Sequence, residues 1–152
     1  MTAIDDLESM GIAYEVVHYG PVRTAEQAAA ARGIELEQLV KTLVVRRGDD
    51  DYIFVLITGN CAIDWKMLRA ALGVRRLTMP SPEEAQHATG YKRGTITPLG
   101  ASHRWPVLAD VRVAELQMIS LGSGEHGRAI NVDATALLDA LDATVVAVAA
   151  PQ

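Results

Sequence analysis

The sequence predicts an α+β fold: a mixed, largely antiparallel sheet, curved or barrel-like, with helices packed outside it. Two apolar, β-branched runs at residues 40–46 and 52–58 flank Gly48 and three aspartates, a pattern typical of an antiparallel hairpin. Short segments with helix caps alternate with strand-like runs along the rest of the chain. This alternation, with strands at hairpin spacing, disfavours a parallel nucleotide-binding fold. A dinucleotide fingerprint and a phosphate-binding loop are both missing, which disfavours hydride transfer and nucleotide hydrolysis.

The N-terminal third predicts helix, strand and helix ahead of the hairpin. Residues 4–10 are expected to form a short helix and residues 14–19 a strand that ends before Gly-Pro. Thr24 begins a capping box, because its hydroxyl can accept from the Gln27 N–H while the Gln27 side chain reaches back. Gly33 is the matching helix stop.

The middle of the chain predicts two further helices with a short strand between them. Asp64 can cap a helix through residue 72, and residues 76–79 read as a strand. Ser81 then caps a helix to about residue 88, with proline at its first position and glutamate three residues after the cap.

The last third predicts strands at residues 106–109, 115–121 and 128–132. Asp133 caps a helix through residue 141. The final apolar run, residues 145–149, is either a strand or a tail.

The bulk properties indicate one soluble, cytoplasmic domain over residues 1–152. The single cysteine, Cys61, excludes an intramolecular disulfide and is typical of a reducing compartment. The N-terminus carries acidic residues where a signal peptide carries basic ones, and no apolar run is long enough to cross a membrane. Nothing in the sequence indicates an oligomeric state.

Charge is unevenly distributed along the chain. The formal net charge is −5, yet residues 65–104 hold seven basic residues and only two acidic ones. Such a segment can bind phosphates, although solvated helix faces produce similar counts.

The run from Thr89 to Gly100 is the most distinctive motif, with three glycines and a proline in twelve residues. Glycine permits positive φ and proline fixes φ, so the run predicts a shaped loop. A loop of this kind can present bare N–H groups to a carbonyl oxygen or a phosphate, as an oxyanion hole does. An ordinary turn is the alternative reading.

Two further features are candidates for chemistry. Lys41 begins an apolar strand, where it either meets an anionic partner or extends its ammonium to solvent. Gly122, Ser123 and Gly124 form a second flexible turn, and His126 beside it is either a base or a loop histidine. Ser123 lacks the strand-turn-helix setting of a hydrolase nucleophile.

No metal or cofactor is expected. The four histidines are scattered, with neither paired helical spacing nor cysteine partners, and no nucleotide motif occurs.

Taken together, the motifs resemble the YbaK/ProX family of aminoacyl-tRNA deacylases, related to the editing insertion of bacterial prolyl-tRNA synthetase. The likeness covers about residues 24–141. Its motifs occur in one order: Lys41-Thr42-Leu43-Val44, Asp64-Trp65-Lys66-Met67-Leu68, Glu84-Ala85, Thr89-Gly90-Tyr91-x-x-Gly94-x-Ile96-x-Pro98-x-Gly100 and Gly122-Ser123-Gly124.

The resemblance implies hydrolysis of the ester that links a wrong amino acid to the terminal adenosine of a tRNA, without metal or cofactor. The expected substrate carries a small amino acid such as Ala, Cys or Ser, on tRNA-Pro. Such a site can place a water against the carbonyl and stabilise the oxyanion with backbone donors. The implied partners are a tRNA acceptor end and an aminoacyl-tRNA synthetase, with no membrane.

By the same resemblance, Lys41 would contact the terminal nucleotide or the reacting ester, and Gly94 and Gly100 would shape the pocket and supply N–H donors. The segment from Gly122 to Gly124 would form the facing wall. Residues expected to bind substrate are Thr42, Tyr91, Thr97, Pro98, Gly122, Ser123, Gly124 and His126.

The chain departs from the family pattern in two places. Thr42 stands where some relatives have asparagine or another polar residue, and Glu125 and His126 replace a commonly basic pair. The departures at Glu125 and His126 leave open a non-catalytic module that binds tRNA or a synthetase. The net negative charge leaves open a hydrolase or transferase acting on a small acylated metabolite.

Overall fold

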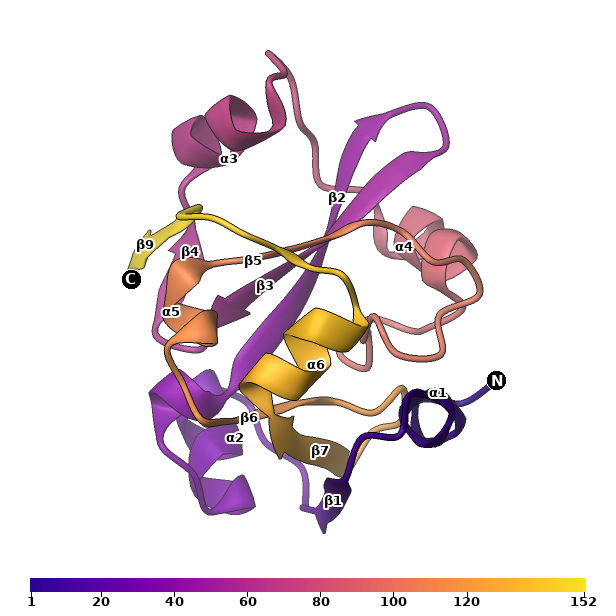
Figure 1. Cartoon of the computed structure of the whole chain (residues 1–152), viewed down its shortest axis with the longest axis vertical. Helices are drawn as coiled ribbons and strands as arrows, with labels where there is room; N and C mark the ends of the chain where they lie inside the picture. The colour runs from indigo at the N-terminus through magenta and orange to yellow at the C-terminus, as the bar shows by residue number, and fades with distance from the viewer.

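The computed structural model describes all 152 residues, and Figure 1 shows how the elements are arranged. None of the helices combines the length and hydrophobicity that a membrane crossing requires. In chain order, the elements are α1 (Ala3–Met10), β1 (Tyr14–His18), α2 (Ala25–Arg32), the 3-10 helix η1 (Leu36–Gln38), β2 (Val40–Gly48), β3 (Asp51–Thr58), β4 (Cys61–Ile63), α3 (Trp65–Leu72), α4 (Pro82–Thr89), β5 (Val107–Ala109), α5 (Val111–Ala114), β6 (Met118–Gly122), β7 (Arg128–Asp133), α6 (Ala134–Ala140), β8 (Thr144–Val145) and β9 (Ala149–Pro151).

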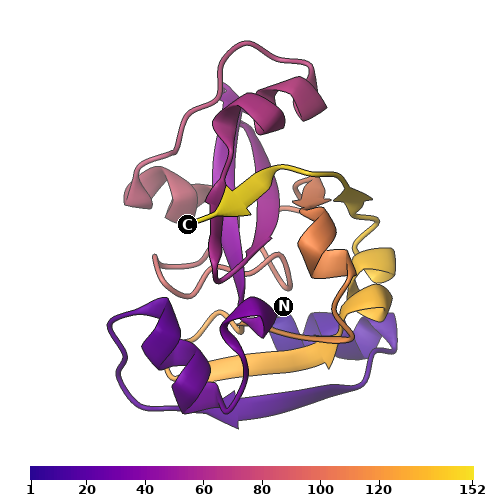
Figure 2. The ribbon, with the colours of Figure 1, turned by 90° about the vertical axis from the view of Figure 1, so that its left-hand side faces the viewer.

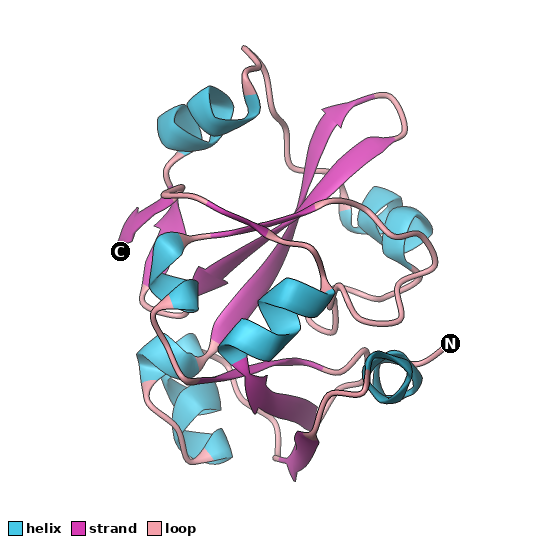
Figure 3. Cartoon of the chain, viewed as in Figure 1, coloured by secondary structure: helices cyan, strands magenta, loops and turns pink.

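The strands form three sheets, in the orders β1-β7-β6, β2-β3-β5-β8 and β4-β9. All pairings are antiparallel except β3 with β5 and β5 with β8, which are parallel. Figure 3 shows the helices distributed around these sheets. The predicted α+β fold with mixed sheets is confirmed, and the sheets do not close into a barrel.

The β2–β3 hairpin is buried on both faces and divides the core. Phe54 and Leu56 belong to a cluster that includes α1 and β6, whereas Ile53 and Val55 belong to a second cluster with α3 and the C-terminal segment. Because strand side chains alternate between faces, neighbouring residues of β2 also point to opposite sides. Lys41 and Thr42 therefore lie on different faces of this sheet.

The predicted helix caps are confirmed. The side chains of Thr24, Asp64, Ser81 and Asp133 each accept a hydrogen bond from the backbone N–H three residues later. The capping box at Thr24 is corrected in one detail: the Gln27 side chain accepts from the N–H of the residue before the cap, at 2.9 Å.

Several short elements differ from the prediction. Residues 76–79 are not a strand, because only Thr78 pairs with β2, through an isolated bridge. The strand predicted from residue 115 starts at Met118, because residues 115–117 form the turn that follows the four-residue helix α5. The three-residue strand β4 was not foreseen, and the C-terminal run divides into β8 and β9. Elements this short hold too few residues to show a hydrophobic period.

Asp6 ties helix α1 to the end of the glycine-rich loop. Its side chain is fully buried, and its carboxylate accepts from the Gly100 N–H at 2.8 Å and from the Arg104 guanidinium at 2.5 Å. Bonds to a charged acceptor in a buried setting are among the stronger hydrogen bonds in proteins. The N-terminal helix thus helps to hold the loop in its conformation.

Replacing Asp6 with alanine is expected to lower the free energy of unfolding by about 2 to 3 kcal/mol, because it leaves the half-buried Gly100 N–H and the Arg104 guanidinium without their acceptor. Asp5→Ala, on the same helix, is the matched control: Asp5 is exposed and contributes only to the helix cap. Urea unfolding of both variants measures the difference. Equal losses in the two variants would contradict the anchoring role.

Candidate functional site

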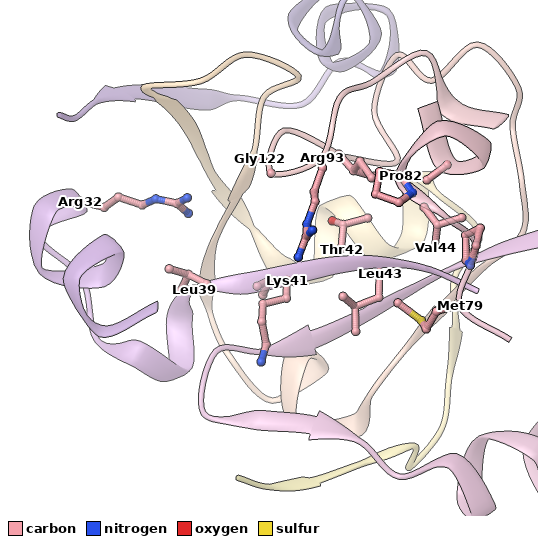
Figure 4. Close-up of a pocket in the computed structure, with 15 residues that line it drawn as sticks. Arg32, Leu39, Lys41, Thr42, Leu43, Val44, Met79, Pro82, Arg93 and Gly122 are labelled. Atoms are coloured by element: carbon pink, nitrogen blue, oxygen red, sulfur yellow. The ribbon is translucent and has the colours of Figure 1, made fainter. Parts of the chain in front are cut away.

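A cavity of about 560 Å³ lies along the outer edge of β2 (Figure 4). Its walls come from the C-terminal end of α2, from residues 40–44 of β2, from the segment that leads into α4, and from the glycine-rich loop with Gly122 opposite. These walls are far apart in the sequence and meet only in the fold.

The edge of β2 that faces this cavity presents backbone groups without a neighbouring strand. Arg46 directs its N–H and C=O away from β3, to Thr78, at 2.8 and 3.1 Å. Because the direction of backbone groups alternates along an antiparallel strand, Val44 and Thr42 direct theirs to the same side.

The residues opposite on β3 support this register. Thr42 pairs with Leu56 and Val44 with Phe54. The Phe54 N–H donates to Pro106, and the Leu56 C=O accepts from Asp110, both on the side away from β2. These are therefore pairs without mutual hydrogen bonds, and the edge of β2 at Thr42 and Val44 is open to a ligand.

Three cations line the cavity, and no carboxylate does: Arg32, Lys41 and Arg93. They come from three parts of the chain, which are α2, β2 and the glycine-rich loop (Figure 4). The Arg32 guanidinium lies 5.0 Å from the centre of the Tyr19 ring and donates to the Ser120 hydroxyl at 3.3 Å. A positive cavity of this composition favours an anionic or electron-rich ligand.

Lys41 is held at the side of the cavity nearest β4. Its ammonium donates to the Cys61 C=O at 2.5 Å and keeps two further N–H groups. Burial lowers the pKa of Lys41 below its ordinary value, and the negative charge of Glu26 is among the effects that act in the opposite direction. The group is a cation that is partly stripped of water, which strengthens its interaction with a bound anion.

Thr42 contributes a hydroxyl on the other face of β2. Its Oγ1 is buried and has no hydrogen-bond partner in the protein. Buried hydroxyl groups are normally hydrogen-bonded, so an unpartnered one in the wall of a cavity is a candidate contact for a ligand.

The predicted loop of residues 89–100 contains no strand, and Gly90, Gly94 and Gly100 all adopt positive φ. Gly94 has φ +87° and lies beside His126. The N–H groups of Gly94 and Ile96 donate no hydrogen bond within the chain, and both residues line the cavity. They add two backbone donors for a ligand to those on the open edge of β2.

The second glycine turn packs against this loop. The Gly124 N–H donates to the Thr95 C=O at 3.1 Å, and a Cβ on Gly124 would lie 2.5 Å from the ring of Tyr91. The Tyr91 hydroxyl donates to the Leu99 C=O at 2.5 Å. Burial, with a smaller effect of Asp6, raises the pKa of Tyr91 to about 12, so the hydroxyl stays neutral.

The structure brings four of the predicted site residues to the cavity: Lys41, Thr42, Gly94 and Gly122. The other predicted site residues do not line it: Tyr91, Thr97, Pro98, Gly100, Ser123, Gly124 and His126.

Two of the predicted roles receive no support from the geometry. The Gly100 N–H is already bonded to Asp6, so it is not free to stabilise an oxyanion. The Ser123 hydroxyl donates to the Arg128 C=O at 2.8 Å and shapes its own turn.

Two cations of the cavity were not singled out from the sequence. Arg93 was counted only as part of the basic run. Its position inside the glycine-rich motif could have identified it as a candidate site residue. Arg32 is an ordinary last residue of a helix, and nothing in the sequence links it to Lys41.

The family model and the individual relatives that match this chain indicate the same family. The model of the aminoacyl-tRNA editing domain matches residues 20–140. The chain is 37% identical over 89 residues to a proline–tRNA ligase of Thermosipho melanesiensis, a match that covers 59% of this chain but only 16% of the ligase. It is 29% identical to a protein of Enterococcus faecalis named as a proposed Cys-tRNA(Pro)/Cys-tRNA(Cys) deacylase, with 76% of this chain and 70% of that one covered.

A solved structure agrees with the sequence matches. It is described as a proposed trans-editing enzyme for prolyl-tRNA synthetase, and it superposes with a TM-score of 0.86 at 27% identity. The superposition covers 95% of this chain and 92% of that one.

Proposed function

Because the chain belongs to the aminoacyl-tRNA editing domain family, we propose that it is a trans-editing deacylase that hydrolyses the ester of a mischarged tRNA in the cytoplasm. The proposed substrate carries a small amino acid such as Cys, Ala or Ser, on tRNA-Pro. The relatives named as a Cys-tRNA(Pro) deacylase and as a trans-editing enzyme support this choice.

The observation that carries the proposal is the cavity itself. It joins free backbone donors, an unpartnered hydroxyl and three cations, and it has no carboxylate on its walls. The 3′ end of a tRNA offers the matching chemistry, since it has a phosphodiester, ribose hydroxyls and an ester carbonyl. The volume of about 560 Å³ lies within the range of pockets that bind small ligands.

The reaction needs no covalent intermediate. A water oxygen bonds to the ester carbonyl carbon, the carbonyl oxygen becomes an oxyanion, and the bond to the ribose oxygen then breaks. Of the two protons of the attacking water, one passes to the ribose oxygen and the other to solvent, and the amino acid leaves as a carboxylate. In this proposal the N–H groups of Gly94 and Ile96 stabilise the oxyanion, and Lys41 neutralises charge on the terminal nucleotide or the ester.

The test is a deacylation time course with tRNA-Pro charged with alanine, cysteine or serine, beside correctly charged Pro-tRNA-Pro. Selective release of one wrong amino acid is the expected result. If the protein binds these tRNAs but leaves every ester intact, it is a binding module, and the proposed activity is wrong.

Replacing Thr42 with valine separates substrate binding from stability. The free energy of unfolding is expected to stay within about 1 kcal/mol of wild type or to rise, because an unpaired buried hydroxyl is removed. Deacylation should fall about tenfold if that hydroxyl contacts the substrate. Steady-state kinetics together with urea unfolding measures both quantities. Undiminished kcat/KM would show that the hydroxyl is not a substrate contact.

A further inference from the structure

Residues 61–80, here called the α3 segment, begin and end at the cavity. The Cys61 C=O accepts the hydrogen bond from Lys41, and the segment returns to the cavity wall at Met79 and Pro80. Between these points the chain passes through α3. Figures 1 and 2 show α3 at the end of the molecule opposite β1 and β7.

The α3 segment is strongly basic. It holds four cations and one acidic residue, Asp64, which is occupied as the cap of α3 and accepts from the Met67 N–H at 3.1 Å. None of the cations forms an ion pair with a carboxylate. The exposed ones are Lys66, Arg75 and Arg76, and Arg69 is half-buried.

An acidic hollow lies on one side of the α3 segment. Thr78 pairs with Arg46 of β2, and beyond that bridge the hairpin tip and the start of α4 line a second hollow. Its walls carry four carboxylates and one guanidinium, so its net charge is negative: Asp49, Asp50, Glu83, Glu84 and Arg46. Arg46 pairs with Asp49 and Glu84, at 2.5 and 3.8 Å. A polyanion is repelled from that side and attracted to α3.

We propose that Lys66, Arg75 and Arg76 of the α3 segment bind the phosphate backbone of the tRNA acceptor stem while the 3′ end occupies the cavity. This inference rests on the proposed function. Duplex nucleic acid carries closely spaced phosphates, and contacts to them fix position without reading sequence. The cations of the α3 segment have no carboxylate partner, and the segment is joined to the cavity at both ends. They can therefore contact phosphates of a tRNA whose 3′ end lies in the cavity.

The test compares two double variants on two substrates. Lys66→Gln/Arg76→Gln removes two charges from the α3 segment. Arg23→Gln/Arg47→Gln removes two charges elsewhere, from the turn before α2 and from β2, where Arg47 pairs with Asp51. The substrates are full-length alanyl-tRNA-Pro and the alanyl ester of the terminal CCA trinucleotide, which lacks the acceptor stem. Kinetics are measured over a range of salt concentrations.

The α3 variant is expected to raise KM for the full tRNA about tenfold at moderate salt, with kcat unchanged, and to reduce the slope of log kcat/KM against log salt by about one to two. The trinucleotide ester should be cleaved at the wild-type rate by both variants. The control variant should behave as wild type on the full tRNA.

An α3 variant with unchanged KM and salt slope would overturn the proposal. Failure of the proposed function gives a different result, because wild type would then cleave neither substrate. In that event, filter binding of uncharged tRNA-Pro to the same variants tests the surface alone. Equal affinity of wild type and the α3 variant would again overturn it.

Discussion

Removal of the Lys41 ammonium, in Lys41→Ala or Lys41→Met, is expected to lower kcat/KM for mischarged tRNA about 100-fold or more while the melting temperature changes little. Loss of one preorganised electrostatic contact at a reacting centre typically has this magnitude. The fold should tolerate the change, because the ammonium makes one hydrogen bond, to Cys61, and is penalised by its partial burial.

Arg23→Ala is the matched control, since Arg23 is exposed and pairs with no carboxylate. Wild-type turnover by Lys41→Ala would remove the lysine from the proposed mechanism. A collapse of its melting temperature would instead assign the residue to folding.

The lowered pKa of Lys41 also makes the free energy of unfolding depend on pH. The folded state releases the lysine proton at a lower pH than the unfolded state, whose pKa is about 10.4. Between these two values the unfolded state binds more protons, so stability rises with pH there. Wild type should therefore gain stability relative to Lys41→Met as pH increases toward about 10.5, as measured by urea unfolding.

Gly100→Ala is expected to lower the free energy of unfolding by about 2 to 4 kcal/mol, from left-handed strain together with a steric clash. Gly100 has φ +66°, and a Cβ there would lie 2.5 Å from the backbone carbon of Thr2. The same shift would disturb the hydrogen bond from Gly100 to Asp6.

Gly11→Ala separates the two causes. Gly11 has nearly the same φ, +71°, but nothing lies within 4 Å of its added Cβ, so it should lose only about 1 to 2 kcal/mol. Thermal or urea unfolding gives the difference between the two variants. If both lose the same amount, the contact with the N-terminal segment contributes nothing.

The local elements were predictable because their signals are local. Thr24, Asp64, Ser81 and Asp133 each begin a helix at the position expected from the capping rule. The parallel pairing of β3 with β5 was not predictable. It involves only Val107, Leu108 and Ala109 of β5, and the partner of so short a run is chosen by packing between distant parts of the chain.

In the candidate site, too, some residues have a local sequence signal and others are placed only by packing between distant segments. Sequence motifs identified three of its residues as candidate site residues: Lys41, Gly94 and Gly122. Arg32 was not identified, because its place in the cavity wall depends on how α2 packs, and no residue near it in the sequence indicates that packing.

By itself, the sequence determined the family, the hairpin, the helix caps and the glycine-rich loop, since each depends on residue types at short spacing. Only the tertiary structure decided which glycine serves which purpose: Gly94 faces the cavity, whereas Gly100 is bonded to Asp6. It also decided that the edge of β2 stays open at Thr42. The physical reason is that burial, hydrogen-bond partners and free donors are properties of contacts between segments far apart in the chain.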